Sequence, residues 1–324
     1  MLSITTADGK FLIRPYQKGD QTDICRLFQE VFGQVKPKEL WEWEFLANPY
    51  GTEIMVCEHV GRGIVAQCAA LPAPFAFNGQ IYRCAQLVDC MCKKEYRMYV
   101  VKKRGLFALT VQEFFNQFTG ENKNIYLYGF PGERHYRLGK LLLGYRKTKP
   151  ALETRVEKIR TWKGFGVRLI ALDSVANYQN QINQLAKQDA KVHPLCLFKE
   201  FNYLSWRYVC SPKKYAFFGL TTFFHKLKSL AILKIERDHL KLIDFLGVTQ
   251  LKKLLFCLWQ EFKKPIILGF PQNSYVHKII KEMGYTPVPV SIPIIPGGKT
   301  FWEKLDWDFA NNNFFYTLGD CDLF

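Results

Sequence analysis

An internal repeat limits the possible fold of this chain more than any other feature of its sequence. A tryptophan followed six residues later by a proline occurs at Trp43 and again at Trp206. Further along, YGFP at 128–131 matches LGFP at 268–271, and in both cases a Gly-Tyr pair begins 15 residues after the glycine of the motif. Two landmarks repeated in the same order predict that one folding unit occurs twice.

The order of the expected elements places the boundary between the two units near residue 160. The charged segment 153–163 has no regular pattern, and we interpret it as the end of the first unit and a linker. From Val167 a strand and then a helix begin again. We therefore expect domains at 1–160 and 161–324. Hydrophobic spacing predicts strands at 11–16, 53–58, 63–71, 75–84 (with a tight turn at Asn78-Gly79), 86–92, 125–129 and 167–172, and helices at 20–32, 37–46, 106–118, 131–144 and 174–187.

The segment 86–115 is where the two units differ most. In the first unit an apolar strand is followed by a basic loop, KKRG at 102–105, and then by a helix. A glycine at a helix start lets the backbone approach a ligand, and the N–H groups of the first turn favour a phosphate.

In the second unit the strand acid and the helical Glu-Phe pair are 17 residues apart rather than 24, and the missing residues are those of the basic loop. An ordinary turn with solvated lysines is the alternative for the loop alone. The comparison favours a first unit that binds a cofactor and a degenerate second unit.

Composition narrows the class of protein without identifying a ligand. The chain has 45 Lys and Arg against 29 Asp and Glu, a formal charge of +16, which attracts anions such as nucleic acid, an acidic lipid surface or a polyphosphate cofactor. Its ten cysteines form no CxxC pair and its six histidines show no ligand spacing, so we expect free thiols and no metal site. No apolar run reaches the roughly 18 residues of a membrane span, and the N-terminus lacks an apolar signal region. These features predict a cytoplasmic protein.

With these elements the chain resembles the GNAT superfamily of acyl-CoA N-acyltransferases in its tandem-domain form. The resemblance rests on a strand, a loop similar to Gln/Arg-x-x-Gly-x-Gly/Ala and a helix at 86–118, and on a short strand and a helix ending in Leu-Gly-Tyr at 128–145. It implies an α/β (α+β) fold of two tandem GNAT-like domains, each with a mixed, largely antiparallel sheet flanked by helices. It also implies acetyl-CoA as the cosubstrate and no metal.

The resemblance carries over to particular residues of the first unit. The backbone of the strand would pair with the pantetheine arm at Cys90, Met91 and Cys92. The loop and helix start would hold the pyrophosphate through Lys102, Lys103, Arg104, Gly105, Leu106 and Phe107. Two departures from the family pattern lie in this loop: residues 98–101 are additional, and Phe107 stands where the family has a small residue.

Acyl transfer to an amine requires a base for the amine and an acid or other stabilising group for the departing thiolate. If the chain is a GNAT enzyme, Glu44 and Asp89 are the candidate bases, and Glu42 is a further candidate. The family's acid is a tyrosine four residues before the Gly-Tyr pair, where this chain has Lys140, so Tyr136 one turn earlier is the candidate. For each of these residues the alternative to catalysis is a structural role, either packed inside the protein or solvated on its surface. The acidic, apolar C-terminal sequence GDCDLF could dock near the site, as a C-terminal carboxylate does in related tandem enzymes, or pack at an edge.

We therefore expect an acetyl-CoA-dependent N-acetyltransferase that acts on a primary amine of a small molecule or a protein. One alternative is a tandem-GNAT transferase that uses aminoacyl-tRNA, and another is a catalytically inactive CoA-binding module. The CoA-type loop and the lack of a helical-hairpin insertion argue against nucleic acid as a partner. The sequence leaves the acceptor and the oligomeric state open.

Overall fold

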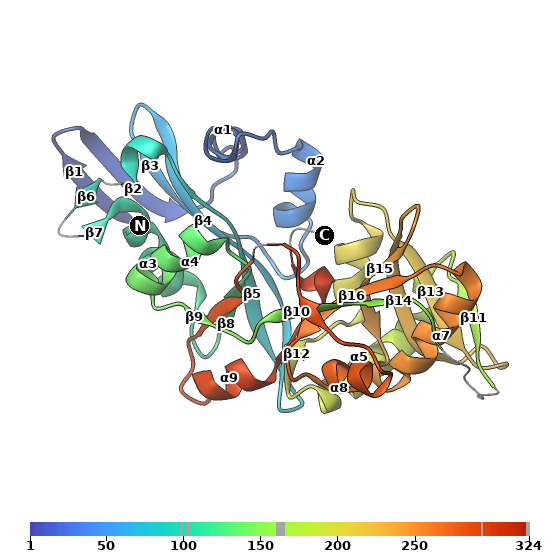
Figure 1. The fold of residues 1–324 in the computed structure, drawn as a ribbon. Coiled ribbons are helices and arrows are strands. Elements are labelled where there is room, and N and C mark those ends of the chain that lie inside the picture. The colour runs from blue at the N-terminus through green and yellow to red at the C-terminus, as the bar shows by residue number, and fades with distance from the viewer. Residues whose placement is uncertain (98, 102–103, 160–165, 293, 322–324) are drawn as a thin grey trace.

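A computed structural model describes residues 1–97, 99–101, 104–159, 166–292 and 294–321. Helices flank two sheets that lie side by side (Figure 1). The strands of the first sheet are β1 (Leu2–Thr6), β2 (Gly9–Pro15), β3 (Glu53–His59), β4 (Gly63–Phe77), β5 (Gln80–Cys92), β8 (Asn124–Gly129), β9 (Arg146–Lys147), β12 (Leu195–Leu197), β18 (Gly297–Thr300) and β19 (Phe314–Phe315). Those of the second are β10 (Ala151–Val156), β11 (Arg168–Ala171), β13 (Ala216–Thr221), β14 (Leu227–Ile235), β15 (Leu240–Leu246), β16 (Ile266–Pro271) and β17 (Val288–Pro289). A small hairpin consists of β6 (Val100–Val101) and β7 (Arg104–Gly105).

The helical elements follow the same repeat in the two halves. The first half contains α1 (Gln21–Phe32), α2 (Lys38–Trp41), η1 (Glu42–Leu46), η2 (Lys94–Tyr96), α3 (Leu106–Phe118) and α4 (Glu133–Leu143). The second contains η3 (Val175–Tyr178), α5 (Gln179–Val192), α6 (Phe201–Leu204), η4 (Ser205–Val209), η5 (Val248–Gln250), α7 (Leu251–Phe262), α8 (Tyr275–Glu282), α9 (Trp307–Asn313) and η6 (Leu318–Asp320). The elements η1 and η4 are π-helical turns, and they hold the repeated tryptophans.

The strand order of both sheets confirms the predicted fold class. The first sheet runs β1-β2-β3-β4-β5-β8-β18-β9, and the second runs β11-β13-β14-β15-β16-β10-β17. Along these orders every neighbouring pair is antiparallel except β5 with β8 and β15 with β16, which are parallel. Each half therefore carries one parallel pair near the middle of a largely antiparallel sheet. These are two tandem GNAT-like domains.

The meander in the first sheet has two breaks fewer than the sequence predicts, and one of them is the expected gap at Ala85, through which β5 continues. The expected tight turn is present, since Asn78 and Gly79 both have positive φ. The expected interruption between residues 71 and 75 is wrong, because β4 continues through Pro72 and Pro74. On one side β4 pairs with β3 up to Ala70 and with β12 from Phe75, so the prolines lie between two partners, where no N–H is needed.

The two sheets exchange strands across residue 160. The segment expected to be an irregular linker forms β10 over its first residues, and that strand lies between β16 and β17 of the second sheet. The alternation of Thr154 and Val156, which are buried, with Glu153 and Arg155 was the period-two signal for it. In return, β18 lies between β8 and β9 of the first sheet. The division at residue 160 stays a proposal about the repeat, because the first sheet includes β12, β18 and β19 from the second half and the second sheet includes β10 from the first.

The two halves meet at the repeated tryptophans. The indole N–H of Trp43 donates to the carbonyl of Trp206 at 2.7 Å, and the indole N–H of Trp206 donates to the carbonyl of Trp43 at 2.9 Å. The two rings stack with their centroids 5.8 Å apart, and both are buried. A reciprocal contact of this kind is what a two-fold axis gives in a symmetric dimer. Here it arises within one chain.

Replacing Trp43 with Phe should destabilise the chain by about 1–3 kcal/mol, because the buried carbonyl of Trp206 would lose its donor. Urea unfolding followed by circular dichroism measures this loss. Trp259→Phe is the control, since that indole also bonds a backbone carbonyl, that of Glu157, but on the surface. An equal loss in the two variants would contradict the role given to the reciprocal pair.

Candidate active site

A free strand edge forms where β5 and β8 separate. Their parallel pairing ends at Gln86 and Tyr128, yet β5 continues to Cys92 while β8 stops at Gly129. Beyond this point β5 is paired with β4 on one side only, in the described part of the sheet. Its backbone from residue 87 to residue 92 therefore borders an opening between the strand and α4.

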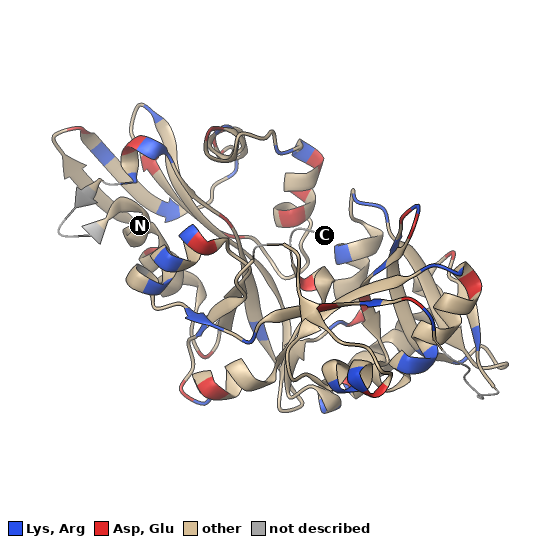
Figure 2. Ribbon diagram, in the orientation of Figure 1, with Lys and Arg blue, Asp and Glu red and all other residues tan. Residues whose placement is uncertain are grey.

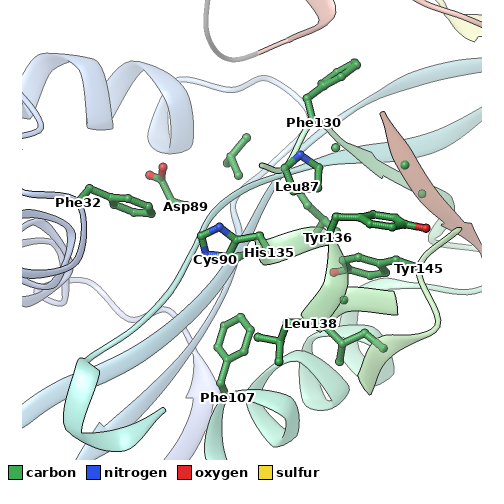
Figure 3. Close-up of a pocket in the computed structure, with 17 residues that line it drawn as sticks. Phe32, Leu87, Asp89, Cys90, Phe107, Phe130, His135, Tyr136, Leu138 and Tyr145 are labelled. Carbon is green, nitrogen blue, oxygen red and sulfur yellow. The ribbon is translucent and has the colours of Figure 1, made fainter. Parts of the chain in front are cut away.

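A bulge at Asp89 bends this free edge. Asp89 has a φ of 47°, and the register between β4 and β5 shifts between Gln67 and Ala69. The side chain of Gln67 donates to the carbonyl of Asp89 at 3.1 Å, which satisfies a backbone group that the bulge removes from the ladder. The bulge turns the Asp89 side chain toward α1 and α2, and it leaves Cys90 on the side of the opening (Figure 3).

Two adjoining cavities fill the opening, and we call them together the β5 groove. Figure 3 shows the inner one. The inner cavity has a volume of about 200 Å³ and the outer one about 690 Å³. Both are lined by Cys90, by Phe107 at the start of α3 and by His135 on α4. Apolar groups dominate the inner cavity, among them Leu87, Val88, Phe130, Leu143 and Tyr145. The outer cavity carries three cations: Arg97, Arg134 and Arg137. The groove is thus apolar inside and cationic at its outer end.

The basic loop predicted to hold a phosphate forms the hairpin β6–β7, immediately before α3. Lys102 and Lys103 lie outside the described residues. Arg104 and Gly105 pair with residues 101 and 100. The N–H of Leu106 donates to the carbonyl of Tyr99 at 2.9 Å, so this predicted phosphate donor already has a partner. Phe107 and the residues after it provide the remaining N–H groups of the first helical turn.

The arginines of the groove were missed in the sequence, although they lie close to residues that were named. The guanidinium Nε of Arg97 donates to the carbonyl of Cys92 at 3.1 Å, which places this cation at the end of the free edge. Arg134 and Arg137 are one turn apart on α4, and Arg137 pairs with Glu133. Two arginines one turn apart, on a helix predicted to begin at Pro131, are a sequence signal for a cationic helix face. Its meaning depends on the contact of α4 with β5, which the sequence does not show.

The two predicted carboxylates meet at a lysine that the sequence analysis did not single out. Lys36 forms ion pairs with both Glu44, from the π-turn η1, and Asp89, from the bulge. Lys36 and Glu44 are each only 8% exposed. Although burial alone would lower the pKa of Lys36, the carboxylates of Asp89 and Glu44 raise it above its ordinary value. Burial raises the pKa of Glu44, and Lys36 opposes that shift. A charged lysine therefore neutralises both candidate bases.

Tyr136 and His135 are neighbours on α4 but point to different places. The Tyr136 ring is buried in the wall of the inner cavity beside Gly297, and its hydroxyl points away from Asp89 (Figure 3). The His135 imidazole points into the groove toward Cys90 and Asp89. His135 is an exposed residue overall, but partial desolvation of its ring lowers its pKa, and the charges of Arg134 and Arg97 lower it further. His135 is therefore neutral near pH 7 and can accept a proton.

The corresponding opening in the second domain is filled by the chain itself. The parallel pairing of β15 with β16 ends at Leu242 and Leu268. Beside it lies η6, whose Leu318 is so close to Gly269 that a Cβ on that glycine would stand 2.4 Å from the Leu318 side chain. Lys199, which precedes Trp206 as Lys36 precedes Trp43, binds Asp244 at 2.7 Å and Asp320 at 2.9 Å. The C-terminal segment thus docks in the second domain as far as it is described.

Comparison with known proteins agrees with this geometry. Residues 12–136 match the family model described as an acetyltransferase (GNAT) domain. The first domain belongs to the GNAT superfamily. The matched range extends from β2 into α4 and so includes the bulged strand, the basic loop, and His135 and Tyr136 of α4. No curated protein matches the sequence.

Solved structures resemble the chain over both domains. A conserved protein of unknown function from Enterococcus faecalis V583, titled a probable N-acyltransferase, is 15% identical, with a TM-score of 0.69 over 90% of this chain and 72% of that one. A GCN5-related N-acetyltransferase from Anabaena variabilis ATCC 29413 is 13% identical, with a TM-score of 0.66 over 90% of this chain and 73% of that one. One from Kribbella flavida is 11% identical, with a TM-score of 0.63 over 90% and 71%. At these identities the likeness is one of fold.

Two further features concern the residues that the structure describes. In them, no cluster of three or more His, Cys, Asp or Glu side chains is placed to hold a metal ion. None of their helices is both long and apolar enough to cross a membrane.

Replacing Lys36 with Met should destabilise the GNAT domain by about 3–5 kcal/mol, because two buried carboxylates would lose their cation. Because burial raises the pKa of Glu44, the loss should be largest above that pKa and should shrink as the pH falls through it and the carboxylate is protonated. Urea unfolding at about pH 5 and about pH 8 tests both statements.

Lys38→Met is the matched control for Lys36, since Lys38 pairs with Glu42 on the surface. A change below about 1 kcal/mol is expected there. If Lys36→Met were equally mild, or if its effect were the same at both pH values, the buried ion triad would not have the role described.

Proposed function

We propose that the first domain binds acetyl-CoA in the β5 groove and transfers the acetyl group to a primary amine. The observation that carries this proposal is the groove itself: a free strand edge leads from an apolar inner cavity to an outer cavity with three arginines. A thiol arm with amide groups, attached to phosphates, matches that order of surfaces. The GNAT family match supports the same reaction class.

The groove residues fit such a molecule group by group. The free edge at Cys90, Met91 and Cys92 offers backbone groups to the pantetheine amides, in the manner of an added strand. Phe107, in the first turn of α3, lines both cavities, and the free N–H groups of a first helical turn, with the helix dipole behind them, favour a pyrophosphate. Arg97 and Arg134 add charge-assisted hydrogen bonds to phosphate oxygens.

The proton transfers are assigned to His135 in this proposal. When the amine nitrogen attacks the thioester carbonyl, a C–N bond forms, the C–S bond breaks and the amine loses a proton. Neutral His135 faces the groove and can take that proton and return it to the thiolate sulfur. Glu44 and Asp89 are less suited to the same task because Lys36 binds both. Tyr136, the acid expected from the sequence, is kept as the alternative donor.

A CoA-binding module without turnover is the second candidate, and one observation favours it. Both carboxylates predicted to act as a base are neutralised by Lys36. Calorimetric titration of the full chain with acetyl-CoA, followed by a thiol-release assay with a panel of amines, separates the two. We expect one molecule bound per chain, because η6 fills the second opening, together with thiol release. Binding without thiol release would favour the module, and no binding would exclude both functions.

Gly105→Asp should weaken acetyl-CoA binding by about tenfold or more, because a carboxylate would stand beside the phosphates. The fold should tolerate it, since Gly105 has a φ of −67°, a Cβ there meets open space, and aspartate is a favoured residue before a helix. Gly105→Ser is the neutral control, and calorimetry with a thermal melt gives both quantities. Equal affinity in the two variants would remove the start of α3 from the phosphate site.

His135→Gln should lower kcat by about 10²-fold or more while changing the KM for acetyl-CoA little. In the parent protein, the lowered pKa of His135 means that kcat/KM, which reports the free enzyme, should fall with a midpoint below the ordinary pKa of histidine. Arg134→Gln should move that midpoint upward, because one of the charges that lower the pKa is removed. Tyr136→Phe is the comparison variant, and a larger loss there than in His135→Gln would assign the proton transfer to the tyrosine.

A further inference from the structure

The loop between β13 and β14 exposes two adjacent phenylalanines at the end of the second domain. Phe223 is 72% exposed and Phe224 is 94% exposed. They belong to the group of large apolar side chains that the fold leaves in water, and they are the only two of that group in the described residues that are adjacent in sequence. The strands around this loop lie on the side of the second domain that faces away from the first (Figure 1). We call residues 222–226 the FF loop.

Hydrogen bonds hold the FF loop in shape, so the exposure of the two rings is not the result of an unstructured turn. The N–H of Thr222 donates to the carbonyl of Lys226 at 3.0 Å, and the N–H of His225 donates to the carbonyl of Thr222 at 3.0 Å. Arg168, at the end of β11, contacts the His225 ring at 3.1 Å. A loop fixed in this way presents both rings together without an ordering cost at binding.

Positive charge and amide groups line a depression that includes the last residue of the FF loop. A depression of about 160 Å³ between α5, η5 and the FF loop is lined by Lys226 and Lys228 and by four glutamines, and no carboxylate lines it. In the described part of the chain, none of Arg168, Lys226 and Lys228 forms an ion pair. Lys and Arg occur throughout both domains (Figure 2), and Lys226 is two residues from the exposed Phe224 in the same loop. The depression offers donors of the kind that bind a phosphate.

The size of the apolar surface decides between kinds of partner. Two phenylalanine side chains offer roughly 300–500 Å² when fully covered, which is well below the roughly 1,600 Å² of a standard protein interface. Two rings at a loop tip can instead enter the boundary layer of a bilayer, and cations near the surface of an anionic membrane add to the attraction.

We propose that the FF loop is a peripheral membrane-binding site, at which Phe223 and Phe224 enter the bilayer interface and the depression at Lys226 and Lys228 takes the phosphate of an anionic lipid headgroup. Binding of this kind is reversible and strongest at low salt. It places the second domain at the membrane and leaves the β5 groove, in the first domain, open to solvent. The site is independent of the acyltransferase proposal and would stand without it.

Sedimentation of the full chain with lipid vesicles tests the proposal. We expect binding to vesicles of phosphatidylcholine mixed with phosphatidylglycerol, much weaker binding to phosphatidylcholine alone, and release as the salt concentration rises. The double variant Phe223→Ser/Phe224→Ser should lose affinity for the mixed vesicles by about tenfold or more. Lys226→Gln/Lys228→Gln should also lose about tenfold or more.

Val60→Ser is the control, because Val60 is an exposed apolar residue in a hairpin turn of the first domain. It should bind the mixed vesicles as the parent chain does, and thermal melts should show that all variants fold. The proposal is overturned if the parent chain does not sediment with mixed vesicles, or if the phenylalanine variant binds them equally well. It is also overturned if that variant dissociates a dimer in size-exclusion chromatography while no form binds vesicles, since the occupant would then be a second copy.

Discussion

The reciprocal hydrogen bonds between Trp43 and Trp206 fix the position of one domain against the other. The candidate active site depends on that arrangement. Each indole is held by a backbone carbonyl of the other half, so neither π-turn can shift without breaking a buried bond. The residues that follow the two tryptophans are Glu44 and Arg207. The positive charge of Arg207 acts on Glu44 across the domain boundary and favours its ionised form. The contact between domains therefore reaches the ion triad around Lys36.

Each half contains a lysine that binds two carboxylates, and the halves differ in which residue supplies the second carboxylate. Each has a lysine seven residues before the tryptophan and an aspartate on the strand of the parallel pair. In the first half the second carboxylate comes from the neighbouring turn, as Glu44. In the second half that position is Arg207, and the second carboxylate is Asp320 from near the C-terminus. Arg207 in turn donates to the carbonyl of Gly319 at 2.9 Å. The position after the tryptophan is thus a carboxylate, Glu44, in the first half and a cation, Arg207, in the second. The change goes together with occupation of the second opening by the C-terminal segment.

The sequence was sufficient for local elements and for the repeat, and it was insufficient for partners far apart in the chain. Helix α3 and the turn at Asn78-Gly79 follow from periodicity and turn residues close together, and the fold class followed from the resemblance to the GNAT superfamily. Lys36 could not be assigned, because a lysine between helices usually lies in water and its burial depends on Asp89, 53 residues away. The same holds for His135, whose direction depends on how α4 packs on β5. Charge counting at the basic loop likewise did not reveal that the N–H of Leu106 is already bonded.

The exchange of strands has a consequence for the order in which the protein can be completed during synthesis. The wall of the inner cavity includes Gly297 and Gly298 of β18, which pair with β8 of the first domain. When only the first half of the chain has emerged from the ribosome, one wall of the groove has therefore not yet been synthesised. The nascent first domain must wait for almost the entire second domain before its cavity closes, so a chain truncated between the two units would lack a finished groove.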